Sequence, residues 1–280
     1  MGYKNLLVQL DTTKACAGRV TAALDLAQRF DAHLVGLYVS PEPIMPVFME
    51  AHLSEELRES QQRARQQRAE RVITAFEEAA RLASARFESR HVTAALDDFP
   101  EVLALHGRYS DLVILGQHDP EDDEALPASL VEETLLGLGR PAILVPYIGA
   151  PEGFGRQIML AWDGGREAAH AASEAIPLMR QAELVRVLCV NPKRGIGGHG
   201  DTPGADIALA LARHGINVEA QHAVSEDLEV AEVLLSRAAD YGTDLIVLGA
   251  YAHSRLRDII LGGVTRTLLR HMTVPLLMAH

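Results

Sequence analysis

The sequence has little of what marks an exported, disulfide-stabilised or membrane-spanning protein. Its only two cysteines, Cys16 and Cys189, lie far apart and form no CxxC pair, which excludes a disulfide framework. No apolar run reaches the roughly 18 residues that a membrane span requires. The first residues also lack the apolar core and cleavage site of a secretory signal. We therefore expect a cytoplasmic protein with no membrane partner.

Basic residues are also in short supply. The 26 lysines and arginines are outnumbered by 38 aspartates and glutamates, giving a formal net charge of −12. Nucleic-acid-binding proteins usually carry a basic footprint, so we expect neither DNA nor RNA as a partner. The apolar fraction of 48% is ordinary for a globular protein, and 280 residues are enough for two domains.

One segment of the chain is written twice. DLVILG ends at Gly116 and DLIVLG ends at Gly249, 133 positions later. The prolines that follow, Pro141 and Pro275, are 134 positions apart. Self-similarity at a fixed offset indicates two copies of one structural unit.

The starts of the two copies match at a larger offset. NLLVQLD ends at Asp11 and QIMLAWD ends at Asp163, 152 positions later, so the first copy is about 19 residues longer in its middle. The Gly/Pro-rich segment 148–155 has the composition of a linker. We expect domains at residues 1–149 and 154–280.

Within each copy, short apolar runs alternate with segments of helical periodicity. The continuously apolar runs 112–115 and 245–248 suit parallel strands that are buried on both faces. This alternation predicts an α/β fold of two tandem five-stranded, mostly parallel, doubly wound domains. The strands are expected at 5–10, 33–39, 87–93, 112–115, 142–146, 157–162, 184–190, 217–223, 245–248 and 274–279. The helices are expected at 15–30, 54–85, 100–107, 130–138, 166–180, 205–214, 226–241 and 264–271.

The strongest chemical signal follows the buried strand 245–248. Gly262 and Gly263 stand just before a predicted helix, where backbone N–H groups can hold a phosphate. Thr265 can add a hydroxyl donor, and His253 and Arg255 place basic groups in the loop before the glycine pair. This arrangement favours an anion site, although a simple tight turn would use the same glycines.

These residues resemble the nucleotide-binding pattern of the universal stress protein family (universal stress protein A family). That pattern is Gly, two residues, Gly, nine residues, Gly, then Ser or Thr. Gly249 and Gly262 fit, while Ala252 stands at the second glycine position and Gly263 at the Ser/Thr position, followed by Val264. The resemblance covers nearly the whole chain, in duplicate.

The resemblance implies adenine nucleotide alpha hydrolase-like domains packed as a pseudo-dimer, with the final strands 142–146 and 274–279 paired across the two-fold axis. It also implies that ATP, with or without Mg, binds in the second copy. Asp163 would read the adenine or ribose, with Val190 beside the base. The site residues expected in this way are Asp163, Val190, Gly249, His253, Arg255, Gly262, Gly263, Val264 and Thr265. A homodimer on top of the pseudo-dimer is a further possibility.

The first copy departs further from the pattern. Gly116 fits and Asp11 is kept, but Asp119 replaces the second glycine and the loop that follows contains four more acids. Carboxylates repel a triphosphate unless a divalent cation bridges them. We therefore expect the first copy to be a structural or regulatory half.

Other readings stay open at this stage. A slow ATPase would need a base, for which His253 or Asp258 are candidates, and a nucleotide-free interaction module would explain Ala252 and Gly263. Gly195–Gly200 match GxGxxG with Glu219 downstream, which would suit a dinucleotide fold, but the spacing to the strand and helix favours a loop. The histidine spacing predicts no metal site. The charged segment 54–85 is read as a solvated helix with i,i+4 ion pairs, or else as a partner-binding face.

Overall fold

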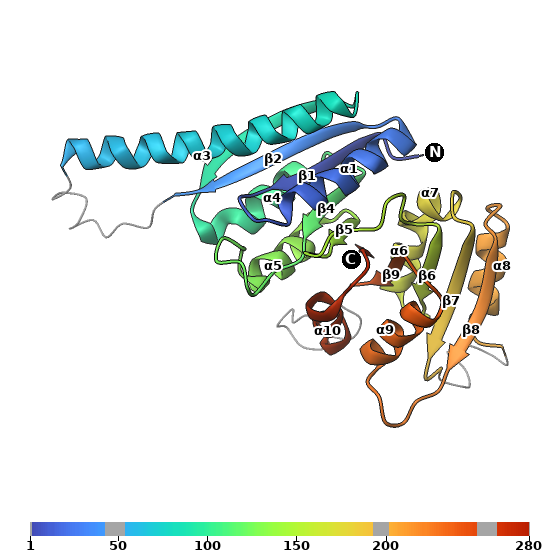
Figure 1. The fold of residues 1–280 in the computed structure, drawn as a ribbon. Coiled ribbons are helices and arrows are strands. Elements are labelled where there is room, and N and C mark those ends of the chain that lie inside the picture. Colours follow the sequence, from blue (N-terminus) through green and yellow to red (C-terminus); the bar gives the residue numbers. More distant parts are fainter. Residues whose placement is uncertain (1, 43–53, 193–201, 251–261, 280) are drawn as a thin grey trace.

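Strands and helices alternate along the chain as the apolar pattern predicts. The computed structural model describes residues 2–42, 54–192, 202–250 and 262–279 (Figure 1). The elements of the first half are β1 (Asn5–Leu10), α1 (Cys16–Phe30), β2 (His33–Pro41), α3 (Glu55–Leu82), β3 (Arg86–Ala94), the short 3₁₀ helix η1 (Leu96–Asp98), α4 (Phe99–Gly107), β4 (Leu112–Gly116), α5 (Ala128–Leu138) and β5 (Ala142–Val145). Those of the second half are β6 (Gln157–Ala161), α6 (Arg166–Glu174), α7 (Ile176–Met179), β7 (Leu184–Val190), α8 (Ala205–Ala212), β8 (Val218–Ala223), α9 (Val230–Asp240), β9 (Leu245–Gly249), α10 (Gly263–His271) and β10 (Leu276–Ala279).

The strands of both copies join into one ten-stranded sheet in the order β3-β2-β1-β4-β5-β10-β9-β6-β7-β8. Neighbouring strands run parallel within each half, and β5 and β10 pair antiparallel, with Ile143 opposite Leu277. The second half of this order is the mirror of the first, as two copies related by a two-fold axis require. The expected pseudo-dimer, with its final strands paired across the axis, is confirmed.

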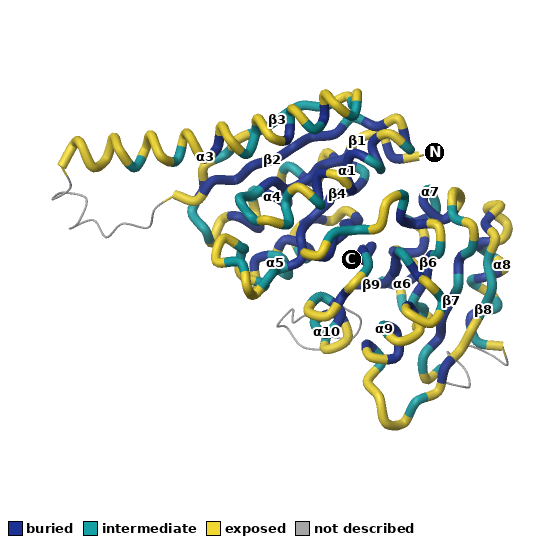
Figure 2. The backbone as a smooth tube through the Cα atoms, in the orientation of Figure 1, coloured by how far each residue is buried: buried dark blue, intermediate teal, exposed yellow. Residues whose placement is uncertain are grey.

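Helices cover both faces of the sheet. Buried side chains of α1, α3, α6, α7 and α8 pack on one face, and those of α4, α5, α9 and α10 pack on the other. The central strands between them lie in the buried interior (Figure 2), while the edge strands β3 and β8 are partly exposed. Alternate residues of one strand pack on opposite faces of the sheet. Leu6 and Val8 pack in the core on the α1 side, and Leu7 packs in the core on the α4 side. This two-sided burial explains why the central strands are apolar at every position.

An aspartate at the head of each repeated motif fastens the first strand of its own copy. Asp111 accepts hydrogen bonds from the backbone N–H groups of Lys4 and Asn5, at 2.7 and 2.9 Å. Asp244 accepts from the N–H groups of Gly155, Arg156 and Gln157, each at 3.0 Å. The Asp in DLVILG and DLIVLG therefore has a structural role, which is to satisfy backbone donors at the start of β1 and β6.

Side chains at the junction tie the two halves together. Gln117, directly after β4, donates its side-chain N–H to the carbonyls of Leu269 and Arg270 at the end of α10, at 2.9 and 3.2 Å. Its amide oxygen accepts from the N–H of Tyr147 at 3.1 Å. A polar residue from the first half thus satisfies the carbonyl end of a helix in the second half.

Two expected helices differ from the structure. The helix expected from residue 226 begins at Val230, where Glu229 and Glu232 form a reciprocal capping box. Ser225 caps only a local turn, because its hydroxyl accepts from the N–H of Leu228 at 3.1 Å. The helix expected over 166–180 is divided at Ala175, just before Pro177, which has no N–H to donate within a helix.

The extra length of the first copy lies in the connection between its second and third strands. This connection contains α3, of 28 residues, whereas the corresponding helix of the second copy, α8, has 8 residues. Ala69, Phe76 and Ala80 on the inner face of α3 are buried, while its first turns are exposed (Figure 2). The expected ion pairs at i,i+4 are present, among them Arg63 with Glu59 and Arg81 with Glu77.

Candidate functional site

The expected site of the second copy lies at the carboxyl ends of β6, β7 and β9. Strand β6 is flanked by β7 on one side and by β9 on the other, so the strand order changes direction between β6 and β9. Ala161 at the end of β6 pairs with Leu188, so that Asp163 and Val190 each lie two residues beyond that pair. Ligands of doubly wound sheets bind at this kind of switch point.

Asp163 presents an exposed carboxylate at this switch point. Its Oδ1 accepts a hydrogen bond from the N–H of Gly165 at 2.7 Å, which shapes the turn into α6. Burial, together with the nearby charge of Asp163, raises the pKa of the Cys189 thiol to about 11. Cys189 is therefore an inert, protonated thiol at neutral pH, as its place in the interior of β7 suggested.

Gly249 at the end of β9 has a clear packing role. A Cβ at this position would lie 2.5 Å from the backbone N of Ala168 and 2.5 Å from the carbonyl carbon of Glu167. The first turn of α6 therefore rests directly against β9, which only glycine allows. This contact accounts for the glycine of the motif without testing its expected role toward phosphate.

The expected phosphate-binding residues stand at the start of α10. Gly262 is the N-cap residue, and no side chain of the described residues caps this helix end. A Cβ on Gly263 would meet no described atom within 4 Å, and Val264 is 36% exposed. Thr265 is buried. No described side chain therefore competes with an anionic acceptor for the first N–H groups of α10.

Several sequence expectations lie outside the described residues. These are His253 and Arg255, the possible base Asp258, the substituted position Ala252 and the glycine-rich segment 195–200. Glu219, the partner that a dinucleotide fold would need, is described and is engaged elsewhere. Its Oε1 accepts from the Nε of Arg186 at 2.7 Å, across the β7–β8 pair.

In the first copy, the equivalent place is filled by the protein itself. Asp11 makes the same turn as Asp163, because its Oδ1 accepts from the N–H of Thr13 at 3.0 Å. Its Oδ2, however, accepts from Nη2 of Arg19 at 2.6 Å, and these side chains are 14% and 3% exposed. The offset between the copies puts Ala171 at the position of Arg19. The second copy therefore has no counterpart of this buried ion pair.

Arg19 also covers the first glycine of the motif. Its Nε donates to the carbonyl of Gln9 at 2.8 Å, and a Cβ on Gly116 would lie 1.8 Å from its Nη1. The cavity left beside Asp11, Arg19 and Gly116 measures only about 10 Å³. A volume of this size holds about one water molecule and no nucleotide.

The acidic loop of the first copy directs its carboxylates to protein donors. Asp119 and Asp122 accept from the backbone N–H groups two residues ahead, and Asp122 also accepts from the N–H of Lys14 at 3.1 Å. Glu124 accepts from the Thr12 hydroxyl at 2.8 Å and pairs with Arg68 at 3.1 Å. Among the described residues, no group of three His, Cys, Asp or Glu side chains is arranged to hold a metal ion.

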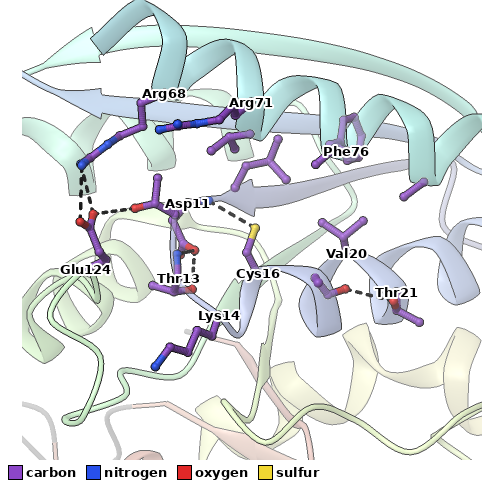
Figure 3. Close-up of a pocket in the computed structure, with 16 residues that line it drawn as sticks. Asp11, Thr13, Lys14, Cys16, Val20, Thr21, Arg68, Arg71, Phe76 and Glu124 are labelled. Atoms are coloured by element: carbon purple, nitrogen blue, oxygen red, sulfur yellow. Dashed lines mark hydrogen bonds and ion pairs between the residues drawn. The ribbon is translucent and has the colours of Figure 1, made fainter. Parts of the chain in front are cut away.

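Sequence reasoning missed one cavity of the first copy. A cavity of about 570 Å³ lies between α1, α3 and the end of β1 (Figure 3). Its walls come from segments more than 40 residues apart in the sequence, which no local motif reveals. The only sequence signal was the extra length in the middle of the first copy, which turns out to build α3.

The comparisons with known proteins identify the family. The model of the universal stress protein family matches residues 2–137 and again 155–280. The chain belongs to this family. It is a tandem universal stress protein, because the family domain occurs twice and the two domains share one sheet. The resemblance drawn from the glycine pattern is confirmed at the level of family and fold.

Solved structures agree with the tandem arrangement. A universal stress protein from Archaeoglobus fulgidus DSM 4304 has a TM-score of 0.74 and 13% identity, over 98% of this chain and 97% of that one. A putative universal stress protein from Pseudomonas aeruginosa UCBPP-PA14 has a TM-score of 0.61 and 14% identity, over 99% and 93%. A universal stress protein in complex with cAMP has a TM-score of 0.35 and 17% identity, over 52% and 99%. No curated protein sequence matches this chain significantly.

In the four described stretches of this tandem universal stress protein, no helix is both long enough and apolar enough to cross a bilayer.

Proposed function

We propose that this tandem universal stress protein is a stress-response protein that binds one adenine nucleotide, with ATP as the expected ligand, through its second domain. The observation that carries the proposal is the contrast between the two aspartates. Asp163 is exposed at the switch point of its sheet, whereas Asp11 is held in a buried pair with Arg19. The two domains thus share a fold but differ in the one place where a nucleotide would bind.

The chemistry of the second site suits a nucleotide. Asp163 still has lone pairs for ribose hydroxyl or adenine amino donors, because its described contact uses one oxygen atom. Val190, half-buried at the end of β7, offers an apolar surface beside the base. The N–H groups of α10 at Gly262–Thr265 would donate to phosphate oxygens, with help from the helix dipole. His253 and Arg255 would add positive charge, and Mg would accompany ATP through its phosphates.

The protein supplies its own reporter for this binding. Trp162, the only tryptophan of the chain, is half-buried directly before Asp163. Titration with ATP should change the fluorescence of Trp162 in a saturable way. Asp163→Ala should weaken the affinity by about tenfold or more, since a charge-assisted hydrogen bond is lost. Asp240→Asn at the opposite edge of the sheet is the matched control and should leave the affinity unchanged.

A second variant separates phosphate binding from base binding. Gly263→Asp adds a Cβ that meets no described atom within 4 Å, and a carboxylate suits a helix N-terminus, so the fold should tolerate it. It would repel the phosphates, and ATP should therefore lose much more affinity than adenosine does. Equal losses for the two ligands would contradict the role of α10 in binding phosphate.

Three outcomes decide between the functions. A saturable ATP signal that requires Asp163 supports the proposal. No signal with ATP, and no nucleotide released on denaturing the purified protein, would instead favour a nucleotide-free interaction module. ADP formation that is lost in His253→Ala would assign a slow ATPase activity.

A further inference from the structure

The cavity between α1 and α3 has an amphipathic lining. Figure 3 shows Arg68, Arg71, Asp11 and Glu124 gathered toward one end, with Phe76 pointing from α3 into the space at the other end. The walls between α1 and α3 are mostly small or apolar; they comprise Leu10, Ala17, Val20, Val72, Ala75, Phe76 and Ala79. At about 570 Å³, the cavity has the size of ordinary small-molecule pockets.

This cavity borders the first copy's equivalent of the nucleotide site, because Asp11 lines both. The space beside Gly116 measures only about 10 Å³, whereas the cavity extends from Asp11 between α1 and α3. The larger cavity depends instead on α3, the helix that is 28 residues long here and has only a short counterpart, α8, in the second copy. Its walls therefore belong to the part of the first copy that was not duplicated.

Most polar groups at the polar end are already paired. Asp11 is paired with Arg19, and Glu124 with Arg68. The hydroxyls of Thr12, Thr13 and Thr21 donate to Glu124, to Asp11 and to the carbonyl of Ala17, respectively. These contacts leave few free hydrogen-bonding groups for a ligand that is rich in heteroatoms, such as a nucleobase.

One cation at the polar end of the cavity remains for a ligand. Arg71 lines the cavity and makes no hydrogen bond or ion pair within the described ranges. Figure 3 shows the Lys14 side chain extending away from the space between α1 and α3, on the far side of Asp11 and Thr13 from Arg71. Because Asp11 and Glu124 are neutralised by their own partners, the positive charge that is not balanced by a close pair comes from Arg71.

We propose that this cavity binds an amphipathic carboxylate, namely an acyl chain of medium length. The alkyl chain lies along Val20, Val72 and Phe76, where each buried CH₂ group contributes favourably by leaving water. The carboxylate lies at the polar end of the cavity and accepts from Arg71. The first domain would thus have lost its nucleotide site and gained a site for a different class of ligand.

Cys16 lines the cavity and makes a site-specific test possible. The rate at which N-ethylmaleimide alkylates Cys16 is measured by peptide mass mapping on the full chain, without nucleotide, in the presence of increasing decanoate. Decanoate should slow the alkylation in a saturable way. Octanoate and hexanoate should bind more weakly by about threefold to fourfold for each CH₂ removed. Cys189, which is fully buried, should stay unmodified, and its alkylation would reveal unfolding.

Variants test which residues contact the alkyl chain and which bind the carboxylate. Ala75→Trp, at an exposed position of α3 that lines the cavity, should fill the space and abolish protection. Arg71→Gln should weaken decanoate by about tenfold or more, while leaving decanol little changed. Arg63→Gln on α3, outside the lining, is the matched control and should bind as the unmodified protein does.

Four results would overturn the proposal. These are no protection by decanoate, protection that persists in Ala75→Trp, equal binding of decanoate and decanol, and protection by ATP in place of decanoate. The last result would assign the cavity to a nucleotide. Because the assay contains no nucleotide in its main arm, its outcome is independent of whether the second domain binds ATP.

Discussion

The buried pair between Asp11 and Arg19 gives the sharpest quantitative prediction. Asp11→Asn keeps the size of the side chain, and the amide oxygen can still accept from the N–H of Thr13. The substitution removes the negative charge that lies 2.6 Å from Arg19. The Arg19 side chain is only 3% exposed, so its positive charge is left buried without a counter-ion. Breaking one partner of a buried pair costs about 3–5 kcal/mol. We expect about 3 kcal/mol here, because the carbonyl of Gln9 still accepts from Arg19.

The second copy supplies the matched control. Asp163→Asn makes the same chemical change at the same point of the fold, and its amide oxygen can still accept from the N–H of Gly165. Asp163 is exposed, and Ala171 stands where the first copy has Arg19. The free energy of unfolding should therefore change by less than about 0.5 kcal/mol.

A double-mutant cycle shows that the cost belongs to the pair. Arg19→Met alone removes the positive charge that pairs with the Asp11 carboxylate. Combining it with Asp11→Asn removes both charges together. The double variant should be more stable than the sum of the single effects predicts, by about 2 kcal/mol. Urea unfolding followed by circular dichroism measures all four proteins, with the slope m checked for constancy. Additive costs, or equal costs for Asp11→Asn and Asp163→Asn, would refute the reasoning.

Three further predictions concern packing, the junction and pH. Gly249→Ala should cost about 2–3 kcal/mol in urea unfolding, because a Cβ would lie 2.5 Å from the backbone of α6 and overpacking costs about 1–3 kcal/mol. Gln117→Leu should cost about 1–3 kcal/mol, measured in the same way, because it removes the donor to two carbonyls at the end of α10 and leaves the N–H of Tyr147 without its acceptor. The Cys189 thiol has a pKa of about 11 in the folded chain and of about 9 when unfolded, so the unfolded state loses this proton first as the pH rises. Its contribution of about 2–3 kcal/mol is present below pH 9 and is lost toward pH 11, and melting curves should show a smaller loss over this range in Cys189→Ala.

The duplication and the buried parallel strands could be predicted because they rest on local and repeated signals, whereas the pairing of the last strands followed from the family resemblance. Apolar runs such as 112–115 and 245–248 identify buried parallel strands. The preserved spacing of Gly116 with Gly249 then aligns the copies. The family pattern also indicates which edge of the sheet holds the site, and Asp163 and Val190 lie at that edge.

The state of the first site could not be predicted from its motif. Asp11 and Gly116 both fit the pattern, yet the side chain that fills the space comes from α1, eight residues after Asp11. Helical periodicity places Arg19 beside the buried Val20 and Ala23, which is unusual for an arginine. Comparison with Ala171 at the aligned position could have drawn attention to it. The cavity under α3 depends on how two distant helices pack, and no local pattern encodes that distance.

The number of ATP molecules bound per chain tests the unequal roles of the two domains most directly. Isothermal titration calorimetry on the full chain should give one site, which Asp163→Ala weakens and which Arg19→Met, in the first domain, leaves at the same affinity. Two sites per chain, or a single site that survives Asp163→Ala, would contradict the assignment of nucleotide binding to the second domain.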